Sequence, residues 1–84
     1  SWGKMVAGST YKLTARATGG GQFRLKIATN CSSPATTVDS GSLVNGGTYQ
    51  FVWPSNVCWV TLQAASGTDA SQTSSAGADL VLVQ

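Results

Sequence analysis

The sequence predicts an all-β domain built as an antiparallel β-sandwich, and three observations support this prediction. Apolar and polar residues alternate in short runs that are rich in β-branched and aromatic side chains and bounded by Gly, Ser, Asn and Pro. No stretch carries a sustained apolar repeat at the helical period. The chain has 84 residues, which suits one domain over 1–84 with a thin core.

We expect five main strands and two shorter pieces. The main strands are Tyr11–Ala17, Gln22–Thr29, Thr48–Trp53, Cys58–Ala64 and Leu80–Gln84. The shorter pieces lie near Lys4–Val6 and around Thr36–Val44. Between the last two main strands, residues 66–78 form a polar, low-complexity stretch that we expect to be a long loop.

The first two strands divide their residues between two faces. Alternate positions are apolar, namely Tyr11, Leu13, Ala15, Ala17, Phe23, Leu25 and Ile27. The positions between them hold four of the five cations, Lys12, Arg16, Arg24 and Lys26. A three-glycine turn at 19–21 would join the strands as a hairpin with Arg16 opposite Arg24. Because like charges across a ladder are unfavourable, this face either binds an absent anionic or polar partner or uses long cations to stay soluble.

The strand Thr48–Trp53 carries three aromatic residues on one face. Tyr49, Phe51 and Trp53 alternate with polar or smaller residues, and three aromatics on one face of a thin domain predict core. Trp53 is therefore expected to be structural.

The strand Cys58–Ala64 turns its tryptophan the other way. Alternation places Cys58, Val60, Leu62 and Ala64 inward and leaves Trp59 outward, beside Thr61 and Gln63. Burial against a loop and stacking on a ligand both explain an outward tryptophan here.

The last strand is apolar on both faces from Leu80 to Val83. Such a strand is either covered on both sides or added to the sheet edge of a neighbouring subunit.

Cysteine content and composition indicate an oxidising, extracellular setting. Cys31 and Cys58 have no Cys-x-x-Cys spacing, and the chain has no histidine, so a disulfide is favoured over a metal site, with two buried free thiols as the alternative. Only 10% of the residues are charged, and Ser, Thr, Gly and Ala dominate. We expect a processed or excised module of a secreted protein, because the chain starts at Ser1 and shows no signal sequence.

The groups that catalysis requires are almost absent. The chain has no His and no Glu, and its three carboxylates, Asp39, Asp69 and Asp79, are scattered near predicted loops. We therefore expect no enzyme activity and no cofactor, although a calcium ion held by Asp69 or Asp79 with backbone carbonyls stays open. A net charge of +2 is weak for nucleic-acid binding, and no apolar run is long enough to span a membrane.

Five stretches together follow a family pattern. They are "VAGSTYKLTARATG", "FRLKI", "GTYQFVWP", "CWVTLQA" and "AGADLVLVQ", and they cover most of the chain from Val6 onward. This pattern resembles the jelly-roll carbohydrate-binding modules attached to xylanases, glucanases and other polysaccharide-degrading enzymes. The resemblance implies a reduced jelly roll, because this chain is shorter and leaves little room for the strand that normally precedes "G-x-x-Y". The alternative is that another segment or subunit completes the sandwich.

Two functions follow as expectations. The first is a non-catalytic carbohydrate-binding module of a larger secreted enzyme, which binds a polysaccharide on an exposed sheet face and favours acidic or mixed chains. Its candidate ligand-binding residues are Trp59, Gln63, Arg24, Lys26, Arg16, Gln22 and Gln50. The alternative is a structural subunit of an extracellular filament or surface assembly that pairs through its terminal β-strand.

Overall fold

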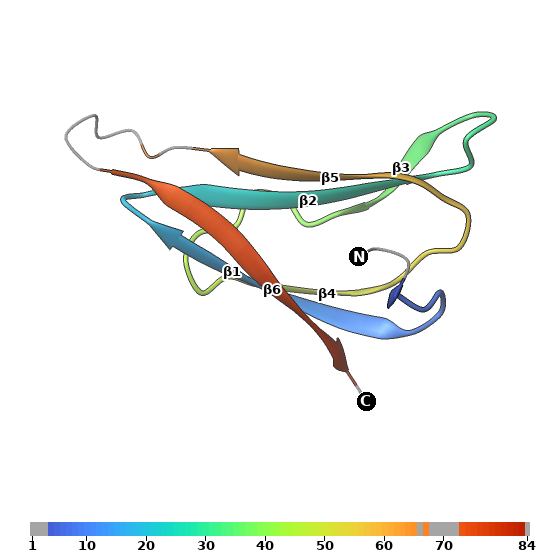
Figure 1. Cartoon of the computed structure of the whole chain (residues 1–84), viewed down its shortest axis with the longest axis horizontal. Helices are drawn as coiled ribbons and strands as arrows, with labels where there is room; N and C mark the ends of the chain where they lie inside the picture. The colour runs from blue at the N-terminus through green and yellow to red at the C-terminus, as the bar shows by residue number, and fades with distance from the viewer. Residues whose placement is uncertain (1–3, 66, 68–72, 84) are drawn as a thin grey trace.

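The computed structural model describes residues 4–65, 67 and 73–83, which form six β-strands and no α-helix. The strands are β1 Thr10–Thr18, β2 Gln22–Thr29, β3 Ala35–Asp39, β4 Thr48–Val52, β5 Val57–Ala65 and β6 Ser75–Val83. They make two antiparallel three-stranded sheets, ordered β4-β1-β6 and β3-β2-β5, which lie as two layers (Figure 1). The predicted β-sandwich is confirmed.

Two predicted elements differ from the observed ones. The last strand begins at Ser75 rather than Leu80, because the small residues from Ser75 to Ala78 pair in register with the end of β1. Near the N-terminus, 4–6 form no strand; instead the Val6 N–H donates a hydrogen bond of 2.9 Å to the Tyr11 hydroxyl. The backbone groups of both segments thus find partners other than those that the local pattern indicated.

The expected hairpin between the first two strands is wrong. β1 pairs with β4 and β6, whereas β2 pairs with β3 and β5, so the chain passes from one sheet to the other at the glycine turn. Gly19 and Gly20 have positive φ angles of 58° and 76°, a backbone region that glycine adopts without steric cost. Arg16 and Arg24 therefore do not face each other across a ladder.

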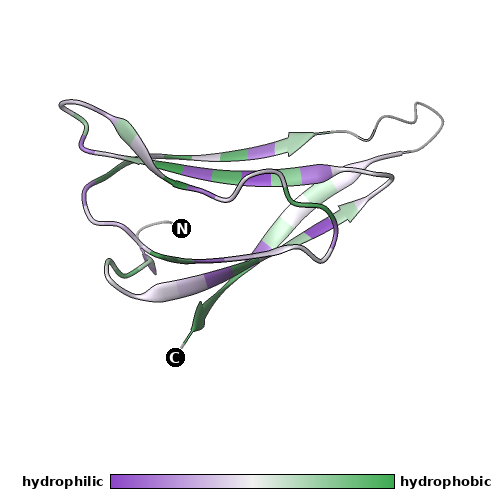
Figure 2. Ribbon diagram, turned by 180° about the vertical axis from the view of Figure 1, so that it is seen from behind, coloured by the Kyte–Doolittle hydropathy of each residue, from purple (hydrophilic) through white to green (hydrophobic). Residues whose placement is uncertain are grey.

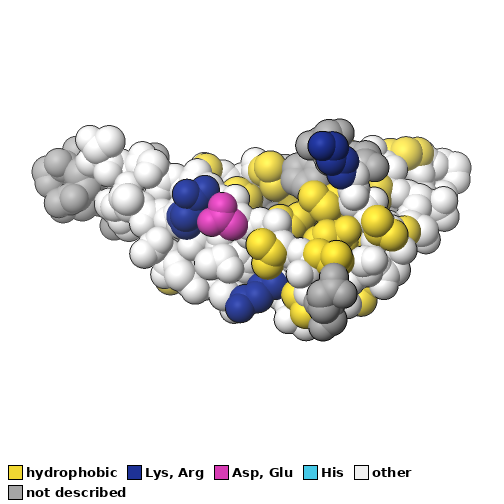
Figure 3. All heavy atoms as spheres, turned by 60° about the horizontal axis from the view of Figure 1, so that its bottom comes forward, with side chains coloured by type: hydrophobic (Ala, Val, Ile, Leu, Met, Phe, Trp, Pro, Cys, Tyr) yellow, Lys and Arg dark blue, Asp and Glu magenta, His cyan; other side chains and the backbone are white. Residues whose placement is uncertain are grey.

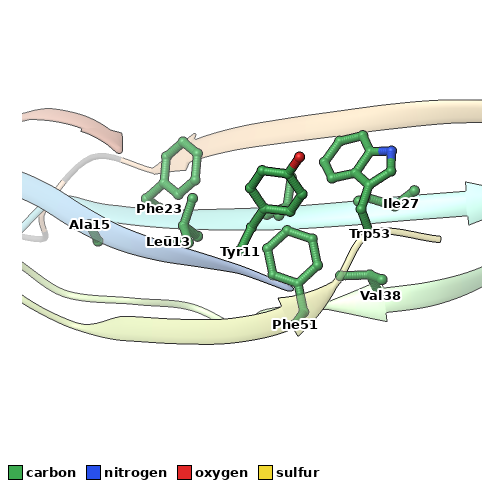
Figure 4. Close-up of a cluster of buried hydrophobic side chains, with 9 residues drawn as sticks. Tyr11, Leu13, Ala15, Phe23, Ile27, Val38, Phe51 and Trp53 are labelled. Carbon is green, nitrogen blue, oxygen red and sulfur yellow. The ribbon is translucent and has the colours of Figure 1, made fainter. Parts of the chain in front are cut away.

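The alternation of apolar residues nevertheless places most of the core correctly, although Leu62 and Ala64, which it also turns inward, are exposed at the end of β5. The buried cluster consists of Tyr11, Leu13, Ala15, Phe23, Leu25, Ile27, Val38, Phe51 and Trp53. Figure 4 shows these side chains pointing into the space between the two layers, and the ribbon in Figure 2 alternates between apolar and polar residues along β2. Trp53 is only 4% exposed, so the expected structural role of this residue is consistent with its burial.

The predicted disulfide joins Cys31, just after β2, to Cys58, the second residue of β5. The two Cα atoms are 5.1 Å apart, within the usual range for a disulfide. Because β2 and β5 are neighbours in one sheet, the bond fastens the end of that sheet where the Thr29 and Val57 positions pair.

The sandwich is open along one margin. Leu62 on β5 lies opposite the buried Leu25, and Leu82 on β6 lies opposite the buried Tyr11, yet both leucines are half exposed. β5 and β6 are edge strands of their sheets. The C-terminal half of β6 is strongly apolar (Figure 2), so this margin presents hydrophobic surface that the fold does not cover.

Candidate functional site

Five of the seven predicted ligand-binding residues lie together on the outer face of the β3-β2-β5 sheet. Their positions follow from the β2–β5 register: Trp59 is opposite Ala28, Thr61 opposite Lys26, Gln63 opposite Arg24, and Ala65 opposite Gln22. We call this surface the Trp59 face and define it by Trp59, Thr61, Gln63, Gln22, Arg24 and Lys26. From the Ala28–Trp59 pair to the Gln22–Ala65 pair the row extends over six residue steps, or about 20 Å at the rise of a β-strand.

Trp59 stands at one end of the Trp59 face and is 40% exposed. Ala28, directly across the ladder, is fully buried. Because opposed side chains on one sheet face lie within contact distance, the indole shields this small residue while part of its ring remains open. Trp59 thus offers a partly exposed indole at this end of the Trp59 face.

Arg24 is held by an ion pair with Asp39 from β3. Its Nε donates to Asp39 Oδ1 at 2.8 Å, and Nη2 donates to Asp39 Oδ2 at 2.6 Å, which is a bidentate geometry. The hydrogen bonds from Arg24 and from the Gly41 N–H hold the pKa of Asp39 well below its usual range. Asp39 thus stays ionised at neutral pH and offsets most of the Arg24 charge.

A shallow hollow lies beyond this ion pair. It encloses about 90 Å³ and is lined in part by Gln22, Arg24, Gln63 and Ser42. Amide and guanidinium groups converge there at the end of the row opposite to Trp59. The Trp59 face therefore combines an aromatic surface at one end with planar hydrogen-bonding groups at the other.

Arg16 and Gln50 lie on the other sheet. Gln50 pairs with Lys12, and Arg16 pairs with Gly77, so both belong to the outer face of the β4-β1-β6 sheet. Arg16 forms an ion pair with Asp79, with 3.0 Å between Nε and Oδ2. Figure 3, which turns the bottom of Figure 1 forward, shows basic and acidic side chains in contact and a separate area of hydrophobic side chains. The structure thus divides the predicted residue set between two opposite faces.

Asp39 was not identified from the sequence as the ion-pair partner of Arg24. Its position opposite Lys26 depends on the β2–β3 register, which includes an irregularity between Ile27 and Ala28. A single sequence holds no local signal for that pairing. Each of the two described aspartates, Asp39 and Asp79, neutralises one arginine, so the expected continuous cationic stripe is absent from the described part of the chain.

The described residues contain no group of three or more His, Cys, Asp or Glu side chains able to hold a metal ion. Of the two aspartates considered for calcium, Asp79 is bound by Arg16, and Asp69 lies outside the described residues. Within the same residues, no helix has the length and apolar character needed to cross a membrane.

Comparison with known proteins adds no relative: no family model, no curated protein and no solved structure matches this chain.

Proposed function

We propose that this domain is a non-catalytic carbohydrate-binding module that binds an extended polysaccharide along the Trp59 face. The observation that carries the proposal is the alignment of side chains on β2 and β5. The partly exposed Trp59 lies in line with four polar residues, Lys26, Arg24, Gln63 and Gln22. An aromatic ring offers its face to the C–H side of a sugar, and the planar polar groups bond to hydroxyls farther along the chain.

The ion pair between Arg24 and Asp39 bears on the charge of the ligand. An arginine that is already bidentate to a carboxylate gains little from a second carboxylate on a ligand. The pair still presents donor and acceptor atoms to hydroxyl groups at its margins. Neutral polysaccharides therefore fit the Trp59 face better than the acidic chains that the sequence alone favoured.

Trp59→Ala tests this proposal. We expect the variant to lose about thirtyfold or more in affinity, because aromatic anchors at binding hot spots contribute about 2 kcal/mol or more. The measurement is isothermal titration or affinity electrophoresis with soluble xylan, a mixed-linkage β-glucan and polygalacturonate.

Trp59→Tyr is the matched control, since it keeps an aromatic surface and should retain most of the binding. The proposal fails if the parent protein binds none of these polymers, or if Trp59→Ala binds them as the parent does. Stronger binding to polygalacturonate than to both neutral polymers would contradict the part of the proposal that concerns charge.

A second candidate function, self-association through β6, is favoured by a different observation. β6 is nine residues long, lies at a sheet edge, and exposes Val81 on one face and Leu82 on the other. Edge strands offer backbone hydrogen-bonding groups to another chain, and long apolar ones favour pairing. A second copy added antiparallel to β6 would extend the sheet and place its own side chains beside Val81 on one face and Leu82 on the other.

Val81→Glu separates this candidate from a monomeric binding module. Val81 lies opposite Lys12, so the new carboxylate gains a cross-strand partner of opposite charge, while two paired edges would bring like charges together. We expect sedimentation to shift from dimer or larger species to monomer. Val44→Glu is the control, because Val44 is 58% exposed against 55% for Val81 but lies in a loop. A parent protein that stays monomeric at every concentration excludes the candidate.

A further inference from the structure

A larger hollow lies on the opposite side of the sandwich, at one end of the β4-β1-β6 sheet. It is open to solvent and has a volume of about 410 Å³, within the range of about 300–1,000 Å³ that is usual for small-molecule sites. Its lining includes Arg16 and Thr18 from β1, Asn45 from the β3–β4 connection, and Ser75 and Gly77 from β6. We call it the Gly77 hollow.

The hollow exists because one strand lacks side chains at this point. Gly77 lies directly opposite Arg16, and a Cβ atom added to Gly77 would meet nothing within 4 Å. On the same face of β6, Gly77 lies between Ser75 and Asp79. The space therefore stays open because position 77 of β6 is a glycine.

On the side of β1 away from β6, the loop that carries Asn45 is held in place by hydrogen bonds. Asn45 Oδ1 accepts from the Ala17 N–H at 3.0 Å. The next two residues continue the contact, since the Gly46 N–H donates to the Ala15 carbonyl and the Ala15 N–H donates to the Gly47 carbonyl, both at 2.8 Å. Asn45 is therefore held beside β1 with its oxygen engaged, which leaves the two N–H donors of its amide for another partner.

The polar groups of the hollow also have unused bonding capacity. Arg16 reaches Asp79 Oδ2 through Nε, and among the described residues its terminal nitrogens have no hydrogen-bond partner. This differs from the bidentate Arg24–Asp39 pair, where both carboxylate oxygens are engaged. At the other end of the hollow, the hydroxyls of Thr18 and Ser75 lie 2.7 Å apart, and each can form a further bond.

We propose that the Gly77 hollow binds a neutral sugar ring through its vicinal hydroxyls. Adjacent hydroxyls each donate and accept, and the lining of the hollow offers them the terminal nitrogens of Arg16, the amide N–H groups of Asn45 and the hydroxyls of Thr18 and Ser75. Asp79 offsets the Arg16 charge, so the site matches a neutral ligand rather than an anion. The site does not depend on the proposed function of the Trp59 face, because it lies on the outer side of the other sheet.

The experiment is a titration of the ¹⁵N-labelled protein with glucose, galactose, mannose and xylose, with galacturonate as an anionic probe. We expect at least one neutral sugar to shift the signals of the Gly77 N–H and the Asn45 side-chain amide in a saturable manner. Gly77→Val should remove these shifts while its spectrum stays dispersed, because the side chain enters open space and valine suits a strand. Val81→Thr, on the same face of β6, is the matched control and should leave the shifts unchanged.

Asn45→Asp supplies a second variant that keeps the acceptor for the Ala17 N–H but removes both amide donors. We expect it to weaken binding about tenfold, as judged by its Thr18 and Gly77 signals. Trp59→Ala should leave these signals unchanged, which separates a failure of this site from a failure of the proposed function. The inference is overturned if no neutral sugar shifts the NMR signals of the hollow residues, or if only galacturonate shifts them. It is also overturned if Gly77→Val still binds the neutral sugar.

Discussion

Trp53→Ala is expected to remove about 3–5 kcal/mol of folding free energy, the usual cost of truncating a buried tryptophan. The side chain is 4% exposed and packs edge-on against Tyr11, with ring centroids 6.0 Å apart and an interplanar angle of 74°. It also contacts Phe51 at 6.0 Å between centroids. In a domain this small, the whole stability lies near the lower end of about 5–15 kcal/mol, so the variant should be largely unfolded.

The measurement is urea unfolding followed by far-ultraviolet circular dichroism. Trp59→Ala is the matched control, because it makes the same chemical change at a residue that is 40% exposed, and its midpoint should lie much closer to that of the parent. The backbone hydrogen bonds from Gly8 N–H to the Trp53 carbonyl and from Trp53 N–H to the Ser9 carbonyl do not need the indole. Equal midpoints for the two variants would contradict the assignment of Trp53 to the core.

Reduction of the Cys31–Cys58 disulfide is expected to lower the free energy of unfolding by about 3–4 kcal/mol in the chain-entropy model. The sequence separation of 27 residues sets the loop that the bond closes in the unfolded chain. The same loop contains β3 and β4, one from each sheet, so its release frees parts of both layers.

Unfolding with and without a reductant provides the measurement, and thiol titration under denaturing conditions counts the free cysteines. The Cys31→Ser/Cys58→Ser variant should match the reduced protein, because it removes the bond without adding free thiols. Two free thiols in the untreated protein would show that the disulfide does not form. An unchanged midpoint after reduction would show that the bond does not stabilise the fold.

The directions of the side chains were determined by the sequence alone. Alternation at period 2 is a property of each strand by itself, so it correctly placed Leu25 and Ile27 inside and Arg24 outside. The same rule separated Trp53 from Trp59, although both lie in apolar stretches. The disulfide pairing followed because the chain offers only two cysteines.

The neighbours of each strand were decided by the tertiary structure. A glycine turn such as 19–21 serves either a hairpin within one sheet or a passage between two sheets, and alternation is the same in both cases. Because the chain passes between the two sheets here, Arg16 forms its ion pair with Asp79 and Arg24 forms its ion pair with Asp39. The same passage places the predicted ligand-binding residues on opposite faces. The Gly77 hollow also depends on that choice, because it forms only where β6 and the Asn45 loop flank β1. Side-chain direction is local and readable from sequence, whereas strand pairing is settled by long-range backbone hydrogen bonds and packing that no short stretch encodes.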